Sequence, residues 1–399
     1  MEKGSTLISI EEAQNLVLTC SSLATVLLEV PLIDALDFVL ARDVISEIDM
    51  PPFRQSAMDG YALKISSEKA YTIIGEIQAG DHANPTLKNT EAVRIFTGAP
   101  VPDSADAVIM QEKVAVDGTR MSPQMPLVSE MNIRPRGSQI KRGATALEKG
   151  TVLKGAHIGF LASIGVTAVT VYKKPSIGIV ATGNELKAPG SPLEYGEIYE
   201  SNGTMLSAVL RELGYLDTAI TTVIDDYEET KKTLETAIKK HDVVMVTGGV
   251  SVGDYDFVGK ALKAIGVAEI FYKVKQKPGK PLFFGKKGST AVFGLPGNPA
   301  AALSCFYIYV YPLLKKTEGA TQTQLLRIEM PILEDYNVRG DRAQFLKAYV
   351  EGAHVQILGG QSSAMVRAFG AANALVFLPE NTTIVKRGTP VKTILLPTK

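Results

Sequence analysis

The chain has 399 residues, a length that suggests two to four domains. Its residues are 45% hydrophobic and 21% charged, a composition typical of globular proteins. Lys and Arg together number 42, as do Asp and Glu, so the formal net charge is zero. This balance argues against a nucleic-acid partner, which would require a surplus of basic residues.

The sequence gives no sign of export or of membrane insertion. The segment 1–14 is charged and lacks the apolar stretch of a signal peptide. The longest apolar run, Ala300–Leu314, contains Pro312 and is shorter than the roughly 20 residues of a membrane-spanning helix, which favours a buried helix. Cys20 and Cys305 lie far apart in the chain, have apolar neighbours and lack the spacing of metal ligands, so we expect both to be reduced core residues. We therefore expect a cytoplasmic protein with no membrane partner.

The first part of the chain predicts a helix and then a β-rich module. Ser9 and Glu12 have the spacing of a capping box, which predicts a helix from this point to about Leu28. Farther on, strand-like runs such as Tyr71–Ile77 and Ala107–Met110 are separated by Gly, Pro and Asp. Such short runs are typical of a β-rich module.

The rest of the chain divides into an alternating region and a strand-rich tail. The strands predicted in the alternating region are Ser176–Ala181, Thr218–Ile224, Asp242–Thr247, Ala268–Lys273 and Thr290–Phe293. The helices predicted there are Gly203–Leu213, Tyr227–Lys240, Phe257–Ile265 and Pro299–Leu314. This alternation indicates a doubly wound α/β domain, in which helices cover both faces of a parallel sheet. The strands predicted in the tail, which favour a small β-barrel or sandwich, are Leu325–Met330, Phe345–Val350, Ala374–Phe377 and Val391–Leu396.

A distinctive loop follows each strand of the alternating region. The five loops are Thr182–Glu185, Asp225–Asp226, Gly248–Asp256, Lys277–Pro281 and Gly294–Pro299. Ligands of open α/β sheets bind beyond the carboxyl ends of the strands, so we expect the five loops to converge at one edge of the sheet.

Each loop also has a purely structural explanation. Gly248 and Gly249 suit a tight turn between a strand and a helix, and Asp225 or Asp226 suits a helix cap. The lysines of the fourth loop could simply be solvated, and Pro299 is an ordinary first residue of a helix. One such loop would carry no functional meaning, whereas five at the binding edge favour a ligand site.

Together the loops provide the groups that phosphoryl chemistry requires. Consecutive glycines let backbone N–H groups approach a phosphate. Glu185, Asp226 and Asp256 provide hard oxygen ligands for Mg²⁺, and Lys277 and Lys280 provide positive charge for an oxyanion. The first strand of the region is not followed by GxGxxG, and no intact P-loop is present, so the usual nucleotide motifs do not apply.

A second cluster of motifs lies in the β-rich module. Its segments are Pro51–Phe53, Ser56–Ala62, Ile95–Pro100 and Arg134–Gly137. Pro-Pro and Asp-Gly are ordinary turn formers, so turns alone explain part of this cluster. They explain less well Asp59, which lies between Met58 and Tyr61, and the two arginines beside a glycine.

Six motifs, in their order along the chain, resemble those of the molybdopterin molybdenumtransferase family, which includes the E domain of gephyrin. They are PPFRQSAMDGYA, FTGAPVP, ATGNEL, TGGVSVGDYD, KPGKP and GLPGNP. The resemblance covers essentially the whole chain and includes Arg342–Phe345 in the tail. SAMDGYA and GLPGNP are specific in combination, whereas GGVSVGDYD alone would indicate only a molybdopterin-binding domain.

The resemblance implies a multidomain α/β fold with four parts. They are an elongated helix and strand segment (1–44 and 140–174), a β-rich inserted module (45–139), a molybdopterin-binding α/β domain (175–318) and a C-terminal β-barrel (319–399). It also implies a homodimer in which the inserted module of one subunit faces the central domain of the other and completes a shared site.

The activity implied by the resemblance is a step of molybdenum cofactor biosynthesis. Members of the family insert molybdate into adenylyl-molybdopterin in a Mg²⁺-dependent reaction that releases AMP. A molybdopterin adenylyltransferase and molybdoenzymes are the protein partners that this role suggests. The sequence does not distinguish molybdate from tungstate.

The resemblance also assigns roles to individual residues. The catalytic positions are Asp59, Thr97, Glu185, Lys277 and Lys280. The positions that contact the pterin or the anion are Arg134, Gly248, Gly249, Ser251, Pro296 and Pro299. The Mg²⁺ ligands are Glu185, Asp226 and Asp256, with Asp225 as a competitor of Asp226.

Two residues depart from the family pattern. The family usually has aspartate at the positions of Gln139 and Arg54, so both changes remove a negative charge. They suggest either altered electrostatics at the site or a catalytically quiet paralogue that binds the pterin as a carrier or scaffold. A third hypothesis is an enzyme that adenylates molybdopterin with ATP, but a bare α/β domain would suffice for that step.

Overall fold

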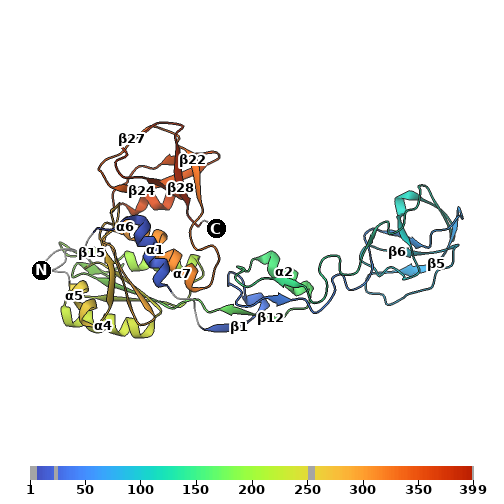
Figure 1. The fold of residues 1–399 in the computed structure, drawn as a ribbon, viewed down its shortest axis with the longest axis horizontal. Coiled ribbons are helices and arrows are strands. Elements are labelled where there is room, and N and C mark those ends of the chain that lie inside the picture. Colours follow the sequence, from blue (N-terminus) through green and yellow to red (C-terminus); the bar gives the residue numbers. More distant parts are fainter. Residues whose placement is uncertain (1–6, 22–25, 250–256, 398–399) are drawn as a thin grey trace. The chain divides into compact units, whose positions relative to one another are not determined.

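The computed structural model describes residues 7–21, 26–249 and 257–397, which form two compact units (Figure 1). The smaller unit comprises residues 29–36 and 40–171, and the larger unit comprises the remaining N-terminal residues and residues 172–399. Each unit has hydrophobic clusters of its own. In the described ranges, no helix is both long and apolar enough to cross a bilayer.

The smaller unit is built on a mixed six-stranded sheet in the order β7-β4-β6-β5-β9-β8. Successive side chains of β4 enter different clusters, since Ala62 packs with Val108 on one face and Leu63 packs with Ile109 on the other. Both faces of the sheet are therefore covered. The strands are β4 (Gly60–Leu63), β5 (Tyr71–Ile77), β6 (Glu91–Ile95), β7 (Ala107–Met110), β8 (Val114–Asp117) and β9 (Arg120–Pro123), and the bounds of β5 and β7 are as predicted.

Short elements complete the smaller unit outside this sheet. They are α2 (Gly155–Ser163), β2 (Val44–Ile45), β3 (Gln55–Ser56), β10 (Ile133–Arg134), β11 (Thr145–Leu147) and β12 (Ala168–Tyr172). β2 pairs with β11 and β3 pairs with β10, both antiparallel. The chain segment that precedes the six-stranded sheet in the sequence therefore pairs with the segment that follows it.

The larger unit contains a second six-stranded sheet in the order β16-β13-β17-β21-β20-β18. The first four strands are parallel, as predicted, but β20 runs antiparallel to both of its neighbours. Strand β20 was not predicted from the sequence. A two-residue turn at Gly288 and Ser289 joins it to β21, and so short a connection makes the two strands antiparallel. The strands are β13 (Ile177–Thr182), β16 (Thr218–Val223), β17 (Val243–Thr247), β18 (Ala268–Tyr272), β20 (Phe283–Lys287) and β21 (Thr290–Leu295).

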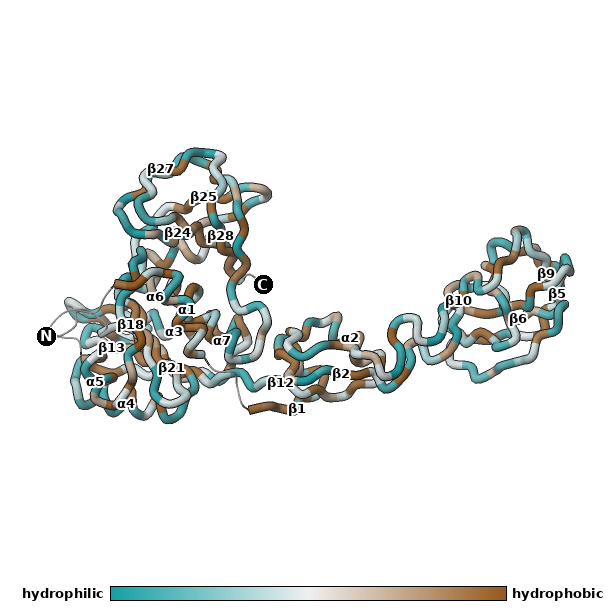
Figure 2. Tube along the Cα trace, viewed as in Figure 1, coloured by the Kyte–Doolittle hydropathy of each residue, from teal (hydrophilic) through white to brown (hydrophobic). Residues whose placement is uncertain are grey.

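Helices cover both faces of this sheet. Strand β17 is buried along its whole length, with Val243 and Met245 in one hydrophobic cluster and Val244 and Val246 in another. Figure 2 shows the hydropathy of each residue along the strands and helices of this unit. The first cluster includes residues of α3 (Asn202–Glu212), and the second includes residues of α4 (Tyr227–Lys240) and α5 (Phe257–Ala264). This is the doubly wound arrangement that the sequence predicts, with all three helices within two residues of their predicted bounds.

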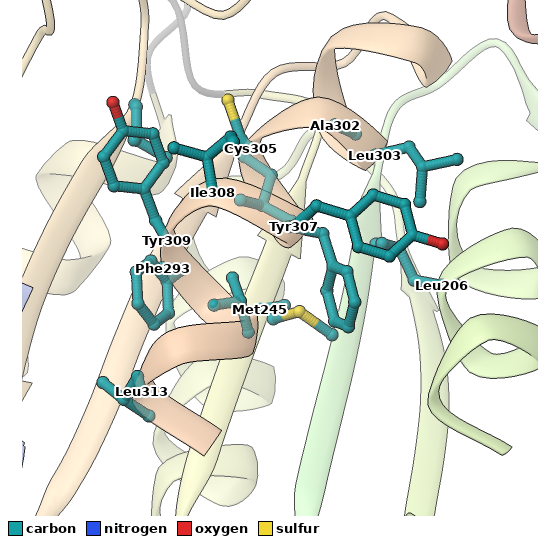
Figure 3. Close-up of a cluster of buried hydrophobic side chains, with 14 of the residues drawn as sticks. Leu206, Met245, Phe293, Ala302, Leu303, Cys305, Tyr307, Ile308, Tyr309 and Leu313 are labelled. Carbon is teal, nitrogen blue, oxygen red and sulfur yellow. The ribbon is translucent and has the colours of Figure 1, made fainter. Parts of the chain in front are cut away.

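The buried helix predicted at Pro299–Leu314 contains an irregular turn. A π-helical turn, Phe306–Val310, separates α6 (Pro299–Cys305) from α7 (Tyr311–Thr317) in the core (Figure 3). Pro312 has no N–H to donate to Ile308 one turn earlier, so it favours such a shift in the hydrogen-bond pattern. The carbonyl of Ile308 accepts a hydrogen bond from the side chain of Gln14 instead, at 3.4 Å.

Helix α1 (Ile10–Cys20) is shorter than predicted. Ser9 caps it by accepting a hydrogen bond from the N–H of Glu12 at 3.0 Å, as the capping pattern indicates. The predicted extension to Leu28 is wrong, because β1 (Leu27–Pro31) begins there. The hydroxyl of Ser21 donates to the carbonyl of Leu18 at 2.7 Å, a local bond that helps to end a helix.

The tail forms a further six-stranded sheet in the order β19-β24-β26-β28-β22, and β25 also pairs with β24. An isolated parallel bridge between Ile332 and Val355 also connects the end of β22 to β25. Strand β19 belongs to the fourth loop of the alternating region, so this loop is part of the tail sheet. The strands are β19 (Gln276–Lys277), β22 (Arg327–Pro331), β24 (Ala343–Glu351), β25 (His354–Ile357), β26 (Ala374–Leu378) and β28 (Pro390–Leu395).

A buried polar cluster joins the ends of α3 and α7. The hydroxyl of Tyr215 donates to Glu318 at 3.0 Å, and Lys315 pairs with the other oxygen of the same carboxylate. Glu318 is 1% exposed, and burial raises the pKa of Tyr215 well above its ordinary value. The carboxylate of Glu318 therefore depends on both partners.

We expect Tyr215→Phe to lower the free energy of unfolding by about 1–2 kcal/mol, because a buried carboxylate loses a hydrogen bond. Tyr199→Phe is the matched control, since its hydroxyl donates to Ser191 O at 2.8 Å on the surface and its loss should cost less than about 0.5 kcal/mol. Urea denaturation measures both changes. Equal shifts in the two variants would contradict this assignment.

Candidate functional site

The parallel register places the ends of three strands in one row. Ala181 lies opposite Thr247, and Thr247 lies opposite Leu295. The next residues are Thr182, Gly248 and Pro296, so the loops after β13, β17 and β21 start at the same level. We expected these loops to converge at one edge of the sheet, and this register produces that edge.

Close approaches connect the five loops. A side chain at Gly248 would collide with the carbonyl oxygen of Thr182, and a Cβ at Gly297 would lie 3.7 Å from the Cα of Gly248. A Cβ at Gly279 would lie 3.7 Å from Pro296. The remaining loop joins the first one, since the N–H of Asp225 donates to Asn184 at 3.0 Å. The described parts of all five loops therefore lie at this edge, as predicted.

Two buried polar atoms at this edge lack a hydrogen-bond partner among the described residues. They are Oγ1 of Thr182, a residue 2% exposed, and Oδ1 of Asn202, a residue 9% exposed. The amide nitrogen of Asn202 donates to the carbonyl of Gly297 at 2.7 Å, which fixes the side chain at the edge. Sequence reasoning missed both roles. Only the position of Thr182 at a strand end could have suggested one.

A cavity of about 740 Å³ opens between this edge and the tail sheet. One wall is the Lys277–Pro281 loop with Pro296 and Asn298. The residues of the other wall include Arg339, Arg342, Gln344 and Leu358–Ser363. Sequence reasoning identified the first wall and noticed Arg342 without giving it a role. It missed Ser362 and Ser363, which belong to no motif.

The Lys277–Pro281 loop is fixed from beneath by Gln276, which is 1% exposed. The amide of Gln276 donates to the carbonyl of Gly279 at 3.0 Å and accepts from the hydroxyl of Tyr309. Arg342 donates to the backbone carbonyl of Gln276 at 3.0 Å. Burial raises the pKa of the Cys305 thiol below this loop to about 12, so this cysteine is an inert core residue, as expected.

The acidic residues proposed as Mg²⁺ ligands are only partly described. Glu185 is exposed after β13, and Asp226 caps α4 by accepting from the N–H of Glu229 at 2.9 Å. The structural explanation for Asp226 is thus confirmed, and one carboxylate oxygen remains outside that bond. Asp256 and the pterin-contact candidate Ser251 lie outside the described residues. Within the described ranges, no group of three His, Cys, Asp or Glu side chains is arranged to hold a metal.

In the smaller unit, Asp59 and Thr97 form a close pair. The backbone N–H and the hydroxyl of Thr97 both donate to one oxygen of Asp59, at 2.7 and 2.8 Å. These bonds, the backbone one first, hold the pKa of Asp59 below its ordinary value. The charge of Arg94 also lowers the pKa of Asp59, and its guanidinium lies 5.0 Å from the centre of the ring of Tyr61, two residues after Asp59. Arg134 donates instead to Gln55 at 3.4 Å.

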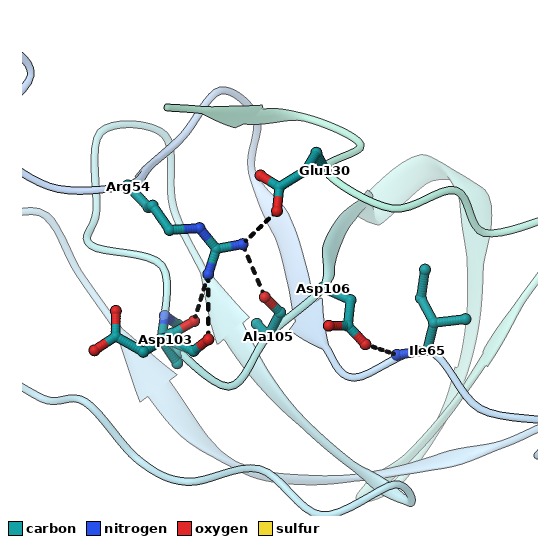
Figure 4. A network of polar contacts seen from close by, with 7 residues as sticks. Arg54, Ile65, Asp103, Ala105, Asp106 and Glu130 are labelled. Carbon is teal, nitrogen blue, oxygen red and sulfur yellow. Dashed lines mark hydrogen bonds and ion pairs between the residues drawn. The ribbon is translucent and has the colours of Figure 1, made fainter. Parts of the chain in front are cut away.

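Arg54 has a structural role in the smaller unit. Its guanidinium donates to the carbonyls of Pro102, Asp103 and Ala105 at 3.2, 3.4 and 2.9 Å and pairs with Glu130 at 3.1 Å (Figure 4). These contacts tie together three segments that are distant in sequence. Arg54 therefore stabilises the smaller unit, and its departure from the family pattern does not require a change of activity.

We expect Thr97→Val to raise the pKa of Asp59 part of the way towards its ordinary value, because Val removes the hydroxyl bond and keeps the backbone bond. A lowered pKa stabilises the fold above the ordinary carboxyl pKa, and this stabilisation is lost as the pH falls through the lowered value. The midpoint of Asp59 in a ¹³C NMR titration measures the change, with Thr97→Ser as the control that keeps a hydroxyl. An unshifted midpoint in Thr97→Val would contradict the pairing.

The close approach at Gly248 predicts a strong effect on stability. Gly248 and Gly266 both have positive φ, at +83° and +77°, but a Cβ at Gly266 would have no heavy atom within 4 Å. Gly266→Ala should therefore cost only about 1 kcal/mol of backbone strain. Gly248→Ala adds a collision with the backbone and should cost more than about 2 kcal/mol. Thermal denaturation of both variants measures the difference, and equal losses would refute the close approach.

The sequence matches three family models along most of its length. They are the MoeA N-terminal region (domain I and II) at residues 8–165, the probable molybdopterin binding domain at 178–316 and the MoeA C-terminal region (domain IV) at 329–396. A molybdopterin molybdenumtransferase of Staphylococcus aureus is 34% identical over 373 residues, 90% of this chain and 89% of that protein. That of Staphylococcus epidermidis is 33% identical over 374 residues, 91% and 89% of the two chains.

Solved structures agree with this assignment. The crystal structure of the molybdopterin biosynthesis moeA protein from Pyrococcus horikoshii has a TM-score of 0.85 and 30% identity, covering 98% of this chain and 100% of that one. A molybdenum cofactor biosynthesis protein from Pyrococcus furiosus, at 20% identity and a TM-score of 0.63 over 98% and 100% of the chains, shares the fold. The chain therefore belongs to the molybdopterin molybdenumtransferase (MoeA) family of enzymes of molybdenum cofactor biosynthesis.

Proposed function

We propose that this enzyme inserts molybdate into adenylyl-molybdopterin, with Mg²⁺, and releases AMP. The observation that carries the proposal is the charge of the cavity beside the carboxyl edge of the sheet. Its basic lining residues are Lys277, Lys280, Arg339 and Arg342, and its described lining includes no Asp or Glu. A cavity with this lining favours an oxyanion and the anionic groups of an adenylated pterin.

The lysines of the fourth loop are the groups best suited to hold molybdate. Both side chains are exposed, while the backbone between them is fixed by the buried Gln276. The ammonium of Lys277 donates to the carbonyl of Arg339 at 3.3 Å, and an exposed charge on a fixed loop can bind an oxyanion without reorganising the fold. Pro296, directly after β21, lines the same cavity, which supports its proposed contact with the pterin or anion.

The glycine edge supplies the surface for the phosphates and the pterin. Gly248 and Gly249 lie against Thr182, where backbone N–H groups can approach a phosphate. The buried Thr182 hydroxyl and the Asn202 carbonyl oxygen provide polar groups that a bound ligand can satisfy. Pro299 begins α6 beside this surface. Ser251, two residues after Gly249 in the sequence, completes the proposed set of contacts.

The donor set at the edge suits Mg²⁺. Glu185 and the remaining oxygen of Asp226 are exposed hard ligands, and Mg²⁺ commonly uses one or two carboxylates besides phosphate and water. Asp256 is the third proposed ligand. When bound, Mg²⁺ neutralises charge on the phosphate oxygens. The protein residues orient the adenylate, and Lys277 and Lys280 stabilise the charge that develops as the phosphoanhydride is cleaved.

The domain division proposed from the sequence also fits the chain's pairing. The antiparallel pair of β2 with β11 joins residues 44–45 to residues 145–147, which supports one part made of 1–44 and 140–174 around the inserted module 45–139. The bridge between Ile332 and Val355 supports a barrel-like closure of the tail, 319–399, after the α/β domain 175–318.

The functional dimer is proposed to share its sites, with Asp59, Thr97 and Arg134 of one subunit facing the central domain of the other. We expect Asp59→Asn and Lys280→Ala alone each to keep less than about a tenth of wild-type activity. In equal mixtures after subunit exchange, about a quarter of wild-type activity should return, because random pairing gives half mixed dimers, each with one intact site. Analytical ultracentrifugation provides the dimer control. No recovery in a confirmed mixture of dimers would refute a shared site.

The direct test is AMP release from adenylyl-molybdopterin by the purified protein with Mg²⁺, with and without molybdate. We expect molybdate-dependent release, and Lys280→Met should slow it about tenfold to a hundredfold by removing a charged contact. Lys392→Met, an exposed lysine stacked on Phe377 in the tail, is the matched control and should leave the rate unchanged. Release that does not depend on molybdate would contradict the proposal.

A catalytically quiet, pterin-binding paralogue is the second candidate, and Gln139 is the observation that favours it. The Gln139 side chain is exposed, where most members of the family carry an aspartate. Tight binding of adenylyl-molybdopterin without AMP release would support this candidate. Restoration of release by Gln139→Asp would then identify the missing carboxylate as the cause.

A further inference from the structure

The tail sheet contains a buried lysine directly behind the cavity. Lys347, on β24, is 4% exposed. Its ammonium donates to the backbone carbonyls of Gly360, Ser362 and Met365, at 2.6, 3.1 and 3.1 Å. Gly360 and Ser362 line the cavity, whereas Lys347 does not. The lysine therefore holds the cavity wall from the side that faces away from the cavity.

The same wall is fixed at two further places. The side chain of Gln361 accepts from the backbone N–H of Lys347 at 3.0 Å and donates to the carbonyls of Lys347 and Leu358 at 2.8 and 2.7 Å. Ser363 accepts a side-chain hydrogen bond from Asn298 at 3.0 Å. The segment 358–363 is thus held to β24 on one side and to the loop before α6 on the other.

The direction of the carbonyls matters for an anion. A loop that lines a cavity can present carbonyl oxygens to the ligand, and these partial negative charges repel an oxyanion. The ammonium of Lys347 draws three carbonyl oxygens to itself, and two of them belong to lining residues. A buried ammonium is costly unless it is hydrogen-bonded, and here the three carbonyls stabilise it. Burial still lowers its pKa from the ordinary value.

We infer that Lys347 is a positioning residue that turns the carbonyls of Gly360 and Ser362 away from the cavity and so makes the 358–363 wall suitable for an oxyanion. The inference rests on the proposed function for the identity of that anion. The placement of the wall itself is independent of any ligand. Lys347 thereby contributes to anion binding without touching the anion.

The test compares Lys347→Met, which keeps the length of the side chain and removes its donors, with Lys392→Met, an exposed lysine of the same sheet. Amide hydrogen exchange of the peptides that cover residues 358–366 is measured without ligand. The affinity of each protein for sodium molybdate is measured by titration calorimetry. We expect exchange at least tenfold faster and an affinity at least tenfold lower in Lys347→Met only. Normal exchange in Lys347→Met, or faster exchange with unchanged affinity, would overturn the inference.

A measurement on the wild-type protein covers the case in which Lys347→Met does not fold. Saturating molybdate should slow exchange in 358–366 and further protect the Lys347 amine from acetylation, because the bound anion stabilises the wall. Unchanged exchange and acetylation in the presence of bound molybdate would overturn the inference. If molybdate does not bind to the wild-type protein, the oxyanion step of the proposed function fails, and the exchange of Lys347→Met without ligand still decides whether this lysine positions the wall.

Discussion

The register of the parallel pairs between β13, β17 and β21 is the constraint on which the site depends. It brings Ala181, Thr247 and Leu295 into one row, so that the following loops start side by side. The loops then approach so closely that a side chain at Gly248 would collide with the backbone at Thr182. Backbone groups and buried polar side chains meet at this edge because the sheet fixes the distance between strands.

The tail sheet supplies the second wall of the cavity at the carboxyl edge of the α/β sheet. Strand β19 begins the Lys277–Pro281 loop and pairs with β24, so one loop belongs to both sheets. Arg342 and Gln276 join them by a hydrogen bond between side chain and backbone. The cavity therefore has basic residues on two walls that are fixed before any ligand arrives. Such preorganised charge is the property that anion binding and phosphoryl chemistry require.

Hydrophobic periodicity predicted the α/β domain closely, since the bounds of α4 were correct and those of β13, β16 and β17 were within one residue. The errors arose where a local interaction ended or redirected an element. Ser21 ended α1 early, a two-residue turn made β20 antiparallel, and Pro312 favoured a π-turn within a buried helix. Each depends on a single residue or turn, to which a window of periodicity is insensitive.

The sequence by itself determined the family, the alternating fold and the loops at the carboxyl edge, because these follow from local periodicity and from contiguous motifs. Only the tertiary structure decided that Arg54 is a structural tie and that Lys347 lies behind the cavity wall. A side chain's role depends on the partners that folding brings to it. For Arg54 and Lys347 those partners are mainly backbone carbonyls of other segments, and such groups leave no pattern in the sequence.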